Sequence, residues 1–275
     1  MLWEELRADQ FEQARIETGG TCIVPMGVIE KHGLHLPIGT DMMIGRGVAE
    51  KAAEIEPAVV FPYYFFGQIA EARHVPGTIS VDHELMYRLL ENVLDEIARN
   101  GFRKLILLNS HGGNNQFINY FIQSTLHKKK DYVVYAVNLM ADSPDMEAKK
   151  AEVLETRDFG DHAGNYETAM VMALRPELVN MDHIETEGIN SYGLLDHFKD
   201  PGTGANDIYT GIWWYADHPT HFAGDPSSAS PAKGERVLDL VVRDTARKIK
   251  TIKEDTAAER LIKEFYEKAD KRNGV

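Results

Sequence analysis

Residues 21–41 read TCIVPMGVIEKHGLHLPIGTD, and the expected fold starts from them. The segment 21–26 is short and mainly apolar, and Gly27 ends it. The polar stretch that follows includes Glu30, His32, His35 and Asp41 among its ionisable side chains. A short apolar run that breaks into glycine and ionisable residues is typical of a buried strand leading into a functional loop. We therefore expect a strand over 21–26 that delivers these side chains to a site.

The order of strand, polar loop and helix recurs along the chain. Apolar runs predict strands over 21–26, 58–67, 104–108 and 132–139. Helical spacing predicts helices over 3–16, 42–56 with Asp41 as its cap, 83–101, 116–128, 166–174 and 232–271 with a break near Asp255. Residues 140–161 are polar, and the Gly- and Pro-rich residues 183–231 predict long ordered loops with short elements. This order predicts an α/β fold, with one three-layer α/β/α domain over residues 1–275 and a mainly parallel sheet.

Charge and cysteine usage exclude several classes of function. Lys plus Arg is 30 and Asp plus Glu is 43, and the net charge of −13 disfavours nucleic-acid and anionic-membrane partners. The single cysteine, Cys22, rules out an intrachain disulfide and favours a reduced, cytoplasmic setting. The acidic N-terminal residues do not resemble an export signal, and no apolar run is long enough to span a membrane.

Three polar loops are expected at the carboxyl edge of the sheet, where ligands gather in open α/β folds. The first holds Glu30, His32 and Asp41, the second holds His111, and the third holds His162 with Glu167. Oxygen and imidazole ligands without a thiolate suit Zn²⁺, Mn²⁺ or Fe²⁺. These loops therefore predict a metal centre.

Charge counting indicates how many ions this centre holds. The carboxylates of Glu30, Asp41 and Glu167 would repel one another if no cation lay between them. One divalent ion leaves a net charge of −1, whereas two leave +1, which a bridging hydroxide cancels. Two ions about 3.5 Å apart would generate a nucleophilic hydroxide and polarise a carbonyl group. That is the chemistry of amide hydrolysis.

Five separated motifs resemble the creatininase, or creatinine amidohydrolase, family. They are EKHGLHLP at 30–37 followed by Asp41, His74 with PGTIS at 76–80, NSHGGN at 109–114, HAGNYET at 162–168, and GDPSSAS at 224–230 with Gly234. The resemblance implies a creatininase-like fold and a dimetal-bound hydroxide that cleaves a non-peptide or cyclic C–N bond. It also implies a small-molecule substrate and a ring-like homo-oligomer such as a hexamer.

The same resemblance assigns roles to individual residues. The implied ligands of two divalent ions, Zn, Mn or Fe, are Glu30, His32, Asp41, His111 and Glu167. Asp41 would bridge both ions, Glu30 and His111 would complete one site, and His32 with Glu167 would complete the other. His162 would be the general acid/base.

Gly112 and Gly113 depart from creatininases, which carry a bulky aromatic residue and a glutamate after the equivalent histidine. Glu167 then has to supply the missing carboxylate. The chain is in this respect similar to family members that act on other substrates, including a formylaminopyrimidine nucleotide deformylase and a peptidase of peptide-derived cofactor maturation. We therefore expect cleavage of an amide, a cyclic amide or a formamide rather than of creatinine.

The expected substrate contacts are His35, His74, Gly112, Gly113 and Trp213. The glycines would let backbone amides approach a substrate carbonyl or phosphate. Trp213 fits a pocket wall or plain packing equally well, and His218 and His221 read as structural. Two other classes of function use the same ligands. One is a non-hydrolytic metal-binding protein, and the other is a metal-assisted lactonase or isomerase.

Overall fold

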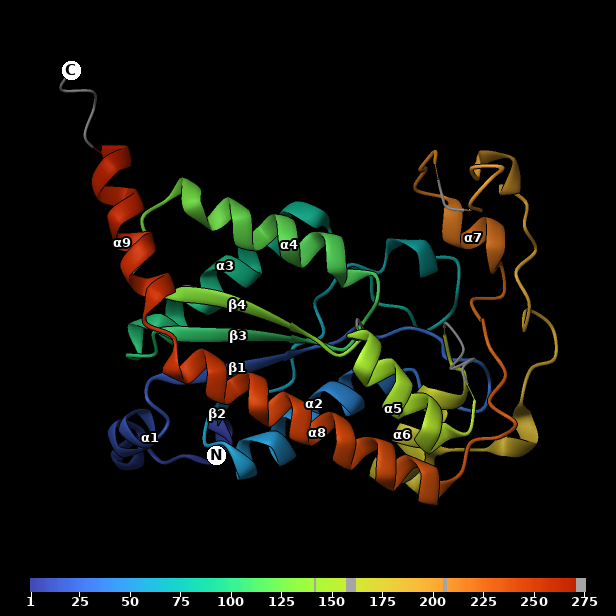
Figure 1. Cartoon of the computed structure of the whole chain (residues 1–275), viewed down its shortest axis with the longest axis horizontal. Helices are drawn as coiled ribbons and strands as arrows, with labels where there is room; N and C mark the ends of the chain where they lie inside the picture. Colours follow the sequence, from blue (N-terminus) through green and yellow to red (C-terminus); the bar gives the residue numbers. More distant parts are fainter. Residues whose placement is uncertain (141, 157–161, 205–206, 271–275) are drawn as a thin grey trace.

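Within the described residues, parallel strands form a sheet in the order β2-β1-β3-β4 (Figure 1). Their bounds are Thr21–Met26 (β1), Val59–Val60 (β2), Lys104–Asn109 (β3) and Val133–Asn138 (β4). The computed structural model describes residues 1–140, 142–156, 162–204 and 207–270. Ile23 lies beside Ile106, and Leu107 lies beside Ala136. Because all strands run in the same direction, their carboxyl ends meet at one edge of the sheet.

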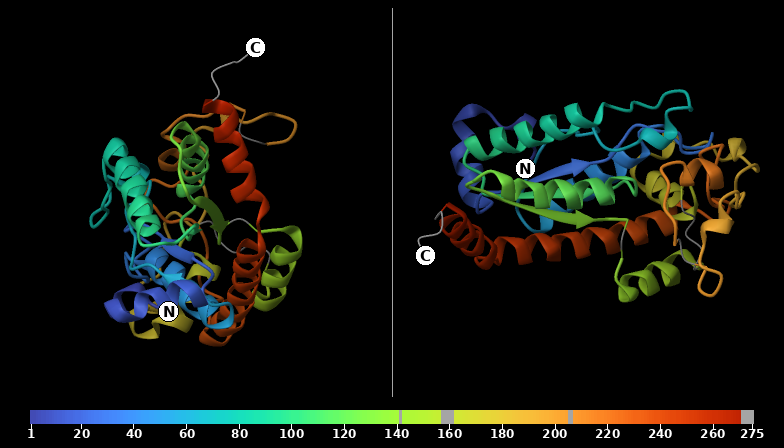
Figure 2. Two further views of the ribbon diagram at one scale, coloured as in Figure 1. Left: turned by 90° about the vertical axis from the view of Figure 1, so that its left-hand side faces the viewer. Right: turned by 90° about the horizontal axis from the view of Figure 1, so that it is seen from above.

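Helices cover both faces of the sheet (Figure 2). One face packs against α1 (Phe11–Glu17), α3 (His83–Arg99) and α4 (Asn114–Ser124). The other face packs against α2 (Thr40–Ile55), α6 (Asn165–Leu174) and α8 (Pro231–Glu254). Successive side chains of a strand point to opposite faces, so Cys22 joins the first core and Ile23 the second. This arrangement confirms the predicted α/β fold with its layers of helix, parallel sheet and helix.

The remaining helices are short or lie at the ends of the fold. They are α5 (Pro144–Leu154), α7 (Trp213–Asp217) and α9 (Ala257–Asp270). Single 3₁₀ turns span Trp3–Glu5, Ala8–Gln10, Ala70–Ala72, Thr125–His127, Pro176–Leu178, Met181–His183 and Asp196–Phe198. None of the helices in the described ranges combines the length and the apolar character needed to cross a bilayer.

The strand predicted over 58–67 is wrong for most of its length. Only Val59–Val60 pairs as a strand, and beyond it a single bridge joins Tyr64 to Met26. Pro62 has no backbone N–H to donate to a neighbouring strand, which explains why the apolar run does not continue as a ladder. The segment instead leads toward the carboxyl edge of the sheet.

One helix prediction also needs correction, and one helix was not predicted. The N-terminal helix predicted over 3–16 begins as two 3₁₀ turns and becomes an α-helix only at Phe11. The polar segment 140–161 contains the unpredicted helix α5, although residues 141 and 157–161 lie outside the described residues. The local signals for α5 are present, because the Ser143 hydroxyl accepts the Met146 N–H at 3.3 Å and Pro144 occupies the first turn.

The long C-terminal helix breaks at Asp255, close to where the sequence predicted a break. Asp255 separates α8 from α9, and its carboxylate accepts the Ala257 N–H at 2.9 Å. Residue 271, the last of the predicted helix, lies outside the described residues. The helices are placed at an angle to each other in Figure 1, so that α8 runs along the sheet while α9 turns away from it.

Gly234 sets how closely α8 approaches α6. A methyl group at Gly234 would overlap the backbone carbonyl of Ala169, which cannot move without distorting α6. Glycine to alanine normally stabilises a helix, but this overlap should dominate. We expect Gly234→Ala to lower the free energy of unfolding by about 1–3 kcal/mol, measured by urea denaturation.

Gly47→Ala in α2 is the matched control for this prediction. Its added methyl group would meet the end of the Leu174 side chain, with Cδ2 at 2.6 Å, and that side chain can rotate away. The control should therefore change stability by less than about 1 kcal/mol. Equal effects of the two substitutions would show that backbone contact at Gly234 does not limit the packing of α8.

Candidate metal centre

Ser110 joins three chain segments at the carboxyl edge of the sheet. It directly follows β3, and its backbone N–H donates to the Met26 carbonyl at the end of β1 at 3.0 Å. Its hydroxyl lies 2.9 Å from the carbonyl oxygen of Asp41 in the first turn of α2. Gly45 makes this approach possible, because a Cβ there would overlap the Ser110 hydroxyl. The segments that carry Glu30, Asp41 and His111 are thereby fixed next to one another.

Asp41 lies between two histidines instead of capping α2. The N-cap position is Gly39, which makes no side-chain cap hydrogen bond, so the prediction that Asp41 caps the helix is wrong. Asp41 Oδ1 is 3.1 Å from His32 Nε2, and Asp41 Oδ2 is 3.0 Å from His111 Nδ1. One buried carboxylate thus presents a different oxygen to each imidazole.

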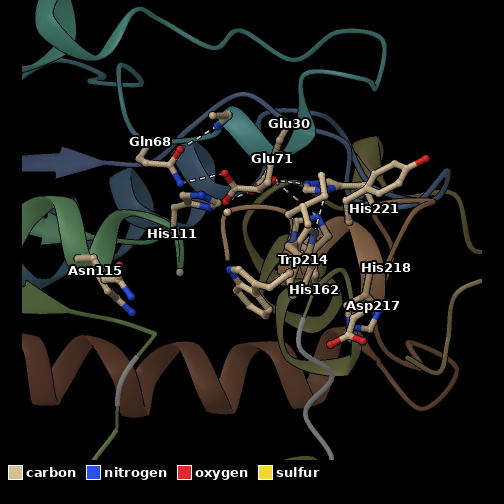
Figure 3. Close-up of a pocket in the computed structure, with 18 of the residues that line it drawn as sticks. Glu30, Gln68, Glu71, His111, Asn115, His162, Trp214, Asp217, His218 and His221 are labelled. Atoms are coloured by element: carbon tan, nitrogen blue, oxygen red, sulfur yellow. Dashed lines mark hydrogen bonds and ion pairs between the residues drawn. The ribbon is translucent and has the colours of Figure 1, made fainter. Parts of the chain in front are cut away.

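A second carboxylate completes each half of the cluster. Glu30 Oε1 lies 2.8 Å from His111 Nδ1, as Figure 3 shows for these two side chains. Glu167 Oε2 lies 3.7 Å from His32 Nε2 and accepts the Ala163 N–H at 2.6 Å. The structure therefore brings all five predicted ligands together in two groups, Glu30–Asp41–His111 and His32–Asp41–Glu167, and the ligand atoms within each group lie within 4.8 Å of one another.

The donor atoms in this cluster fit divalent cations. Among the described residues, Glu30 Oε1, His32 Nε2 and Asp41 Oδ2 are buried and have no hydrogen-bond partner of good geometry, although oxygen and nitrogen atoms lie close by. Buried carboxylates are normally satisfied by hydrogen bonds or by a cation. A set of nitrogen and oxygen donors without sulfur suits Zn²⁺, Mn²⁺ or Fe²⁺.

The cluster also shifts the pKa values of its members. Burial opposes charge on His32, but Asp41 and Glu167 outweigh it and raise the pKa to about 10. Burial opposes charge on His111 in the same way, and Glu30 and Asp41 hold its pKa well above the usual range. Burial raises the pKa of Glu167 to about 7, with His32 opposing the shift and Asp41 adding to it. In the absence of cations, protonated His32 and His111 balance the charge of the neighbouring carboxylates.

His162 lies against the cluster and forms a third group of potential ligand atoms with Glu30 and His32. Its Nε2 is 2.6 Å from the Lys31 carbonyl and 4.0 Å from Glu30 Oε2, and its ring centroid is 4.2 Å from that of His32. Burial, reinforced by the neighbouring His32, holds the pKa of His162 well below its usual range. A carbonyl only accepts hydrogen bonds, so Nε2 carries the proton and Nδ1 keeps a lone pair. His162 is therefore placed as a neutral base.

A cavity of about 1470 Å³ opens next to the cluster. Four of the predicted substrate contacts line it: His74, Gly112, Gly113 and Trp213. A Cβ at Gly113 would lie 2.6 Å from His111 Nε2 and 2.8 Å from Glu71 Oε1, so glycine is the residue that leaves both groups in place. Glu30, His111, His162 and Glu167 also line this cavity, which places the cluster at its wall.

Two of the predicted substrate contacts, His35 and His74, belong to none of the donor groups. His35 is 1% exposed, does not line the cavity, and has its Nε2 2.9 Å from the Thr168 hydroxyl. The structure thus places His35 against α6, outside the cavity lining. His74 is exposed and lies between two carbonyl oxygens, that of Glu71 at 3.1 Å and that of Pro219 at 3.0 Å.

The structure places His221, which was expected to be structural, against the cluster. His221 Nε2 is 2.5 Å from Glu30 Oε2, and Trp214 Nε1 is 2.9 Å from His221 Nδ1 (Figure 3). A backbone bridge between His162 and Ala223 brings this segment to the site, with N–H to carbonyl distances of 2.7 and 3.1 Å. No local sequence pattern around His221 predicts its contact with Glu30, because the two residues lie in segments that are distant along the chain.

The fold and the cluster define an α/β protein with a carboxylate–imidazole centre at the carboxyl edge of its sheet. The family model described as creatinine amidohydrolase matches residues 4–249, so the chain belongs to the creatininase family. The chain is 27% identical over 264 residues to creatinine amidohydrolase of Pseudomonas putida, covering 90% of this chain and 95% of that protein. A solved structure described as "Creatininase Mn" superposes with a TM-score of 0.71 at 24% identity, covering 92% of this chain and 99% of the other.

Family members with other names are also similar to the chain. The mycofactocin precursor peptide peptidase of Mycolicibacterium smegmatis is 27% identical over 238 residues, which is 83% of each chain. A deformylase of Methanobrevibacter smithii that acts on 2-amino-5-formylamino-6-ribosylaminopyrimidin-4(3H)-one 5'-monophosphate is 32% identical over 113 residues, 39% of this chain and 46% of that protein. The predicted resemblance to non-creatinine members is confirmed.

The shared position of Asp41 predicts that both ions depend on it. We expect Asp41→Asn to lose both bound ions, because the amide keeps the shape of the side chain but removes the charge between His32 and His111. Elemental analysis after dialysis in excess metal measures the number of ions per chain. Asp82→Asn, an exposed residue at the start of α3 that belongs to none of the donor groups, should keep the wild-type number. An Asp41→Asn protein with two ions would contradict the bridging geometry.

The shifted pKa values predict how ion binding depends on pH. At neutral pH the metal-free site holds one proton on His32, with a pKa of about 10, and one on His111, whose pKa is also raised. Glu167, with a pKa of about 7, is partly protonated. A cation has to displace these protons, so affinity should rise with pH, by at least about tenfold per unit between about pH 6 and pH 8. Calorimetry in two buffers of different ionisation enthalpy counts the protons released. Affinity that is independent of pH would contradict this charge balance.

Proposed function

We propose that the chain is a metal-dependent amidohydrolase that cleaves a C–N bond of a small molecule. The observation that carries the proposal is the Asp41 carboxylate, whose two oxygens face two different histidines. Each histidine has a second carboxylate beside it, which gives two adjacent sites of three donors. Three carboxylates and two neutral imidazoles balance two divalent ions and one hydroxide.

The residues proposed to hold the ions are those of the two groups. Glu30, Asp41 and His111 would hold one ion, and His32, Asp41 and Glu167 the other. When bound, the ions would lower the pKa of a water molecule and polarise the carbonyl group of the substrate. The manganese named in the description of the similar creatininase structure supports divalent ions in this role.

His162 is proposed to move the proton. Its depressed pKa keeps the imidazole neutral at pH 7, and the Lys31 carbonyl holds the hydrogen on Nε2. Nδ1 can therefore take a proton from the attacking water and give it to the nitrogen that leaves. The amide C–N bond breaks, the carbonyl carbon gains the oxygen of water, and the amine departs with the added proton.

The cavity favours a substrate that extends beyond its reacting amide. Its volume of about 1470 Å³ exceeds the roughly 300–1,000 Å³ of common small-molecule pockets. Trp213 and Tyr215, which are remote in sequence from the donor groups, also line the cavity. Gly112 and Gly113 leave room beside His111. We propose a substituted amide, cyclic amide or formamide. The peptidase and deformylase relatives support including short peptides and formylated nucleotides among the compounds tested.

A substrate screen on metal-loaded protein tests this function. Purified chain with two ions should release an amine from at least one compound in a panel of amides, lactams, formamides and short peptides. A metal-loaded protein that hydrolyses no member of the panel would favour a non-hydrolytic metal-binding role. Turnover of lactones alone would instead favour a lactonase, because the same donors polarise an ester carbonyl.

Loss of His162 should separate ion binding from turnover. We expect His162→Gln to keep both ions and to lower kcat by about 10²–10⁴-fold on any substrate found in the screen, because the basic nitrogen is removed. His127→Gln, on an exposed turn, is the matched control and should keep wild-type kcat. Full activity of His162→Gln would exclude the proposed proton transfer.

A further inference from the structure

We propose that His221 is a positioning residue for Glu30, held in one tautomer by Trp214. The proposal rests on the metal centre of the proposed function, because Glu30 matters there as a ligand. His221 is 1% exposed, and its Nε2 lies 2.5 Å from Glu30 Oε2. It therefore contacts the carboxylate on the oxygen opposite to the one that faces His111.

Trp214 decides which nitrogen of His221 carries the hydrogen. Trp214 Nε1 lies 2.9 Å from His221 Nδ1, and an indole N–H is a donor only. Nδ1 must accept this hydrogen bond with its lone pair, so the hydrogen of the neutral ring resides on Nε2. Nε2–H then donates to Glu30 Oε2. The indole, the imidazole and the carboxylate form a chain in which each hydrogen bond fixes the direction of the next.

This chain determines how Glu30 is presented to an ion. Oε2 is occupied by the hydrogen bond from His221, while Oε1 faces His111 Nδ1 at 2.8 Å. Glu30 is thereby limited to one donor oxygen in a fixed orientation. Hydrogen bonds behind a ligand are a common means of orienting it, and losing them weakens metal binding by about 10–100-fold.

The backbone at His221 is consistent with a requirement for this side chain. Its φ angle is +56°, in the left-handed region that glycine adopts most easily. A turn needed only for its shape would be better served by glycine. The N–H of His221 donates to the His218 carbonyl at 2.9 Å, and the ring packs edge-on against His162 with centroids 4.6 Å apart. Contacts of the buried ring hold this unfavourable conformation.

The test uses variants that each change one residue of this hydrogen-bonded chain. His221→Gly removes the donor and eases the backbone but leaves the space of the buried ring empty, so urea denaturation first checks that the variant is folded. His221→Gln restores an N–H donor of similar reach. Trp214→Phe keeps an aromatic ring but removes the indole N–H. Trp213→Phe changes the neighbouring indole, whose centroid is 5.4 Å from that of Trp214, and serves as the matched control for metal affinity.

Chelator competition on the full chain, with Zn²⁺ or Mn²⁺ alone, measures the affinity of each site. We expect His221→Gly to weaken one site by about 10–100-fold and to leave the other unchanged, since His32, Asp41 and Glu167 do not depend on His221. His221→Gln should recover most of the loss, and Trp213→Phe should match wild type. If the wild-type chain binds two ions and His221→Gly binds them with the same affinity, the positioning role is overturned while the proposed function stays intact.

A nitrogen-15 spectrum of the metal-free chain tests the tautomer independently of ion binding. We expect His221 to carry its hydrogen on Nε2 in the wild type and to become a mixture of tautomers in Trp214→Phe. A wild-type His221 with its hydrogen on Nδ1 would overturn the proposal. Failure of the proposed function would show differently, as a wild-type chain that binds no divalent ion.

Discussion

The sharing of one buried carboxylate between two imidazoles is the interaction on which the site depends. Asp41 stands in the first turn of α2, where the helix dipole favours negative charge, and its oxygens lie 3.1 and 3.0 Å from His32 and His111. Any displacement of α2 relative to β1 and β3 would separate these groups. The Ser110 hydrogen bonds and the close approach at Gly45 prevent that displacement, so packing in the core is linked directly to the geometry of the site.

Burial of these ionisable groups makes their unbalanced charge energetically unfavourable. Carboxylates and imidazoles removed from water must be neutralised by one another, by protons or by cations. The raised pKa values of His32 and Glu167 correspond to neutralisation by protons. The convergence of the donor atoms suits neutralisation by cations. His221 donates to the Glu30 oxygen that does not face His111, and the Ala163 N–H donates to Glu167 Oε2, so each of these hydrogen bonds holds its carboxylate in place. The resulting site is ordered by hydrogen bonds from two distant loops.

Much of the fold and the five converging donors could be predicted from sequence, because strand ends carry a local signal. Apolar runs that break into Gly27 and Ser110 mark where β1 and β3 stop, and the polar side chains beyond them meet at one edge. The shortening of the strand at 58–67 follows from Pro62, a signal that was present but outweighed by the apolar run. His221 could not be predicted, because its left-handed backbone and its approach to Glu30 arise from tertiary contacts. The single domain over 1–275, the cytoplasmic setting and the homo-oligomer stay predictions.

The most direct test of a shared carboxylate is anomalous X-ray diffraction from crystals of the full chain soaked in Mn²⁺ or Zn²⁺. Data collected at the absorption edge locate the ions without reference to activity or substrate. Two peaks about 3.5 Å apart are expected, with one oxygen of Asp41 on each, Glu30 and His111 on the first, and His32 and Glu167 on the second. A single peak, or peaks that do not contact Asp41, would contradict the account.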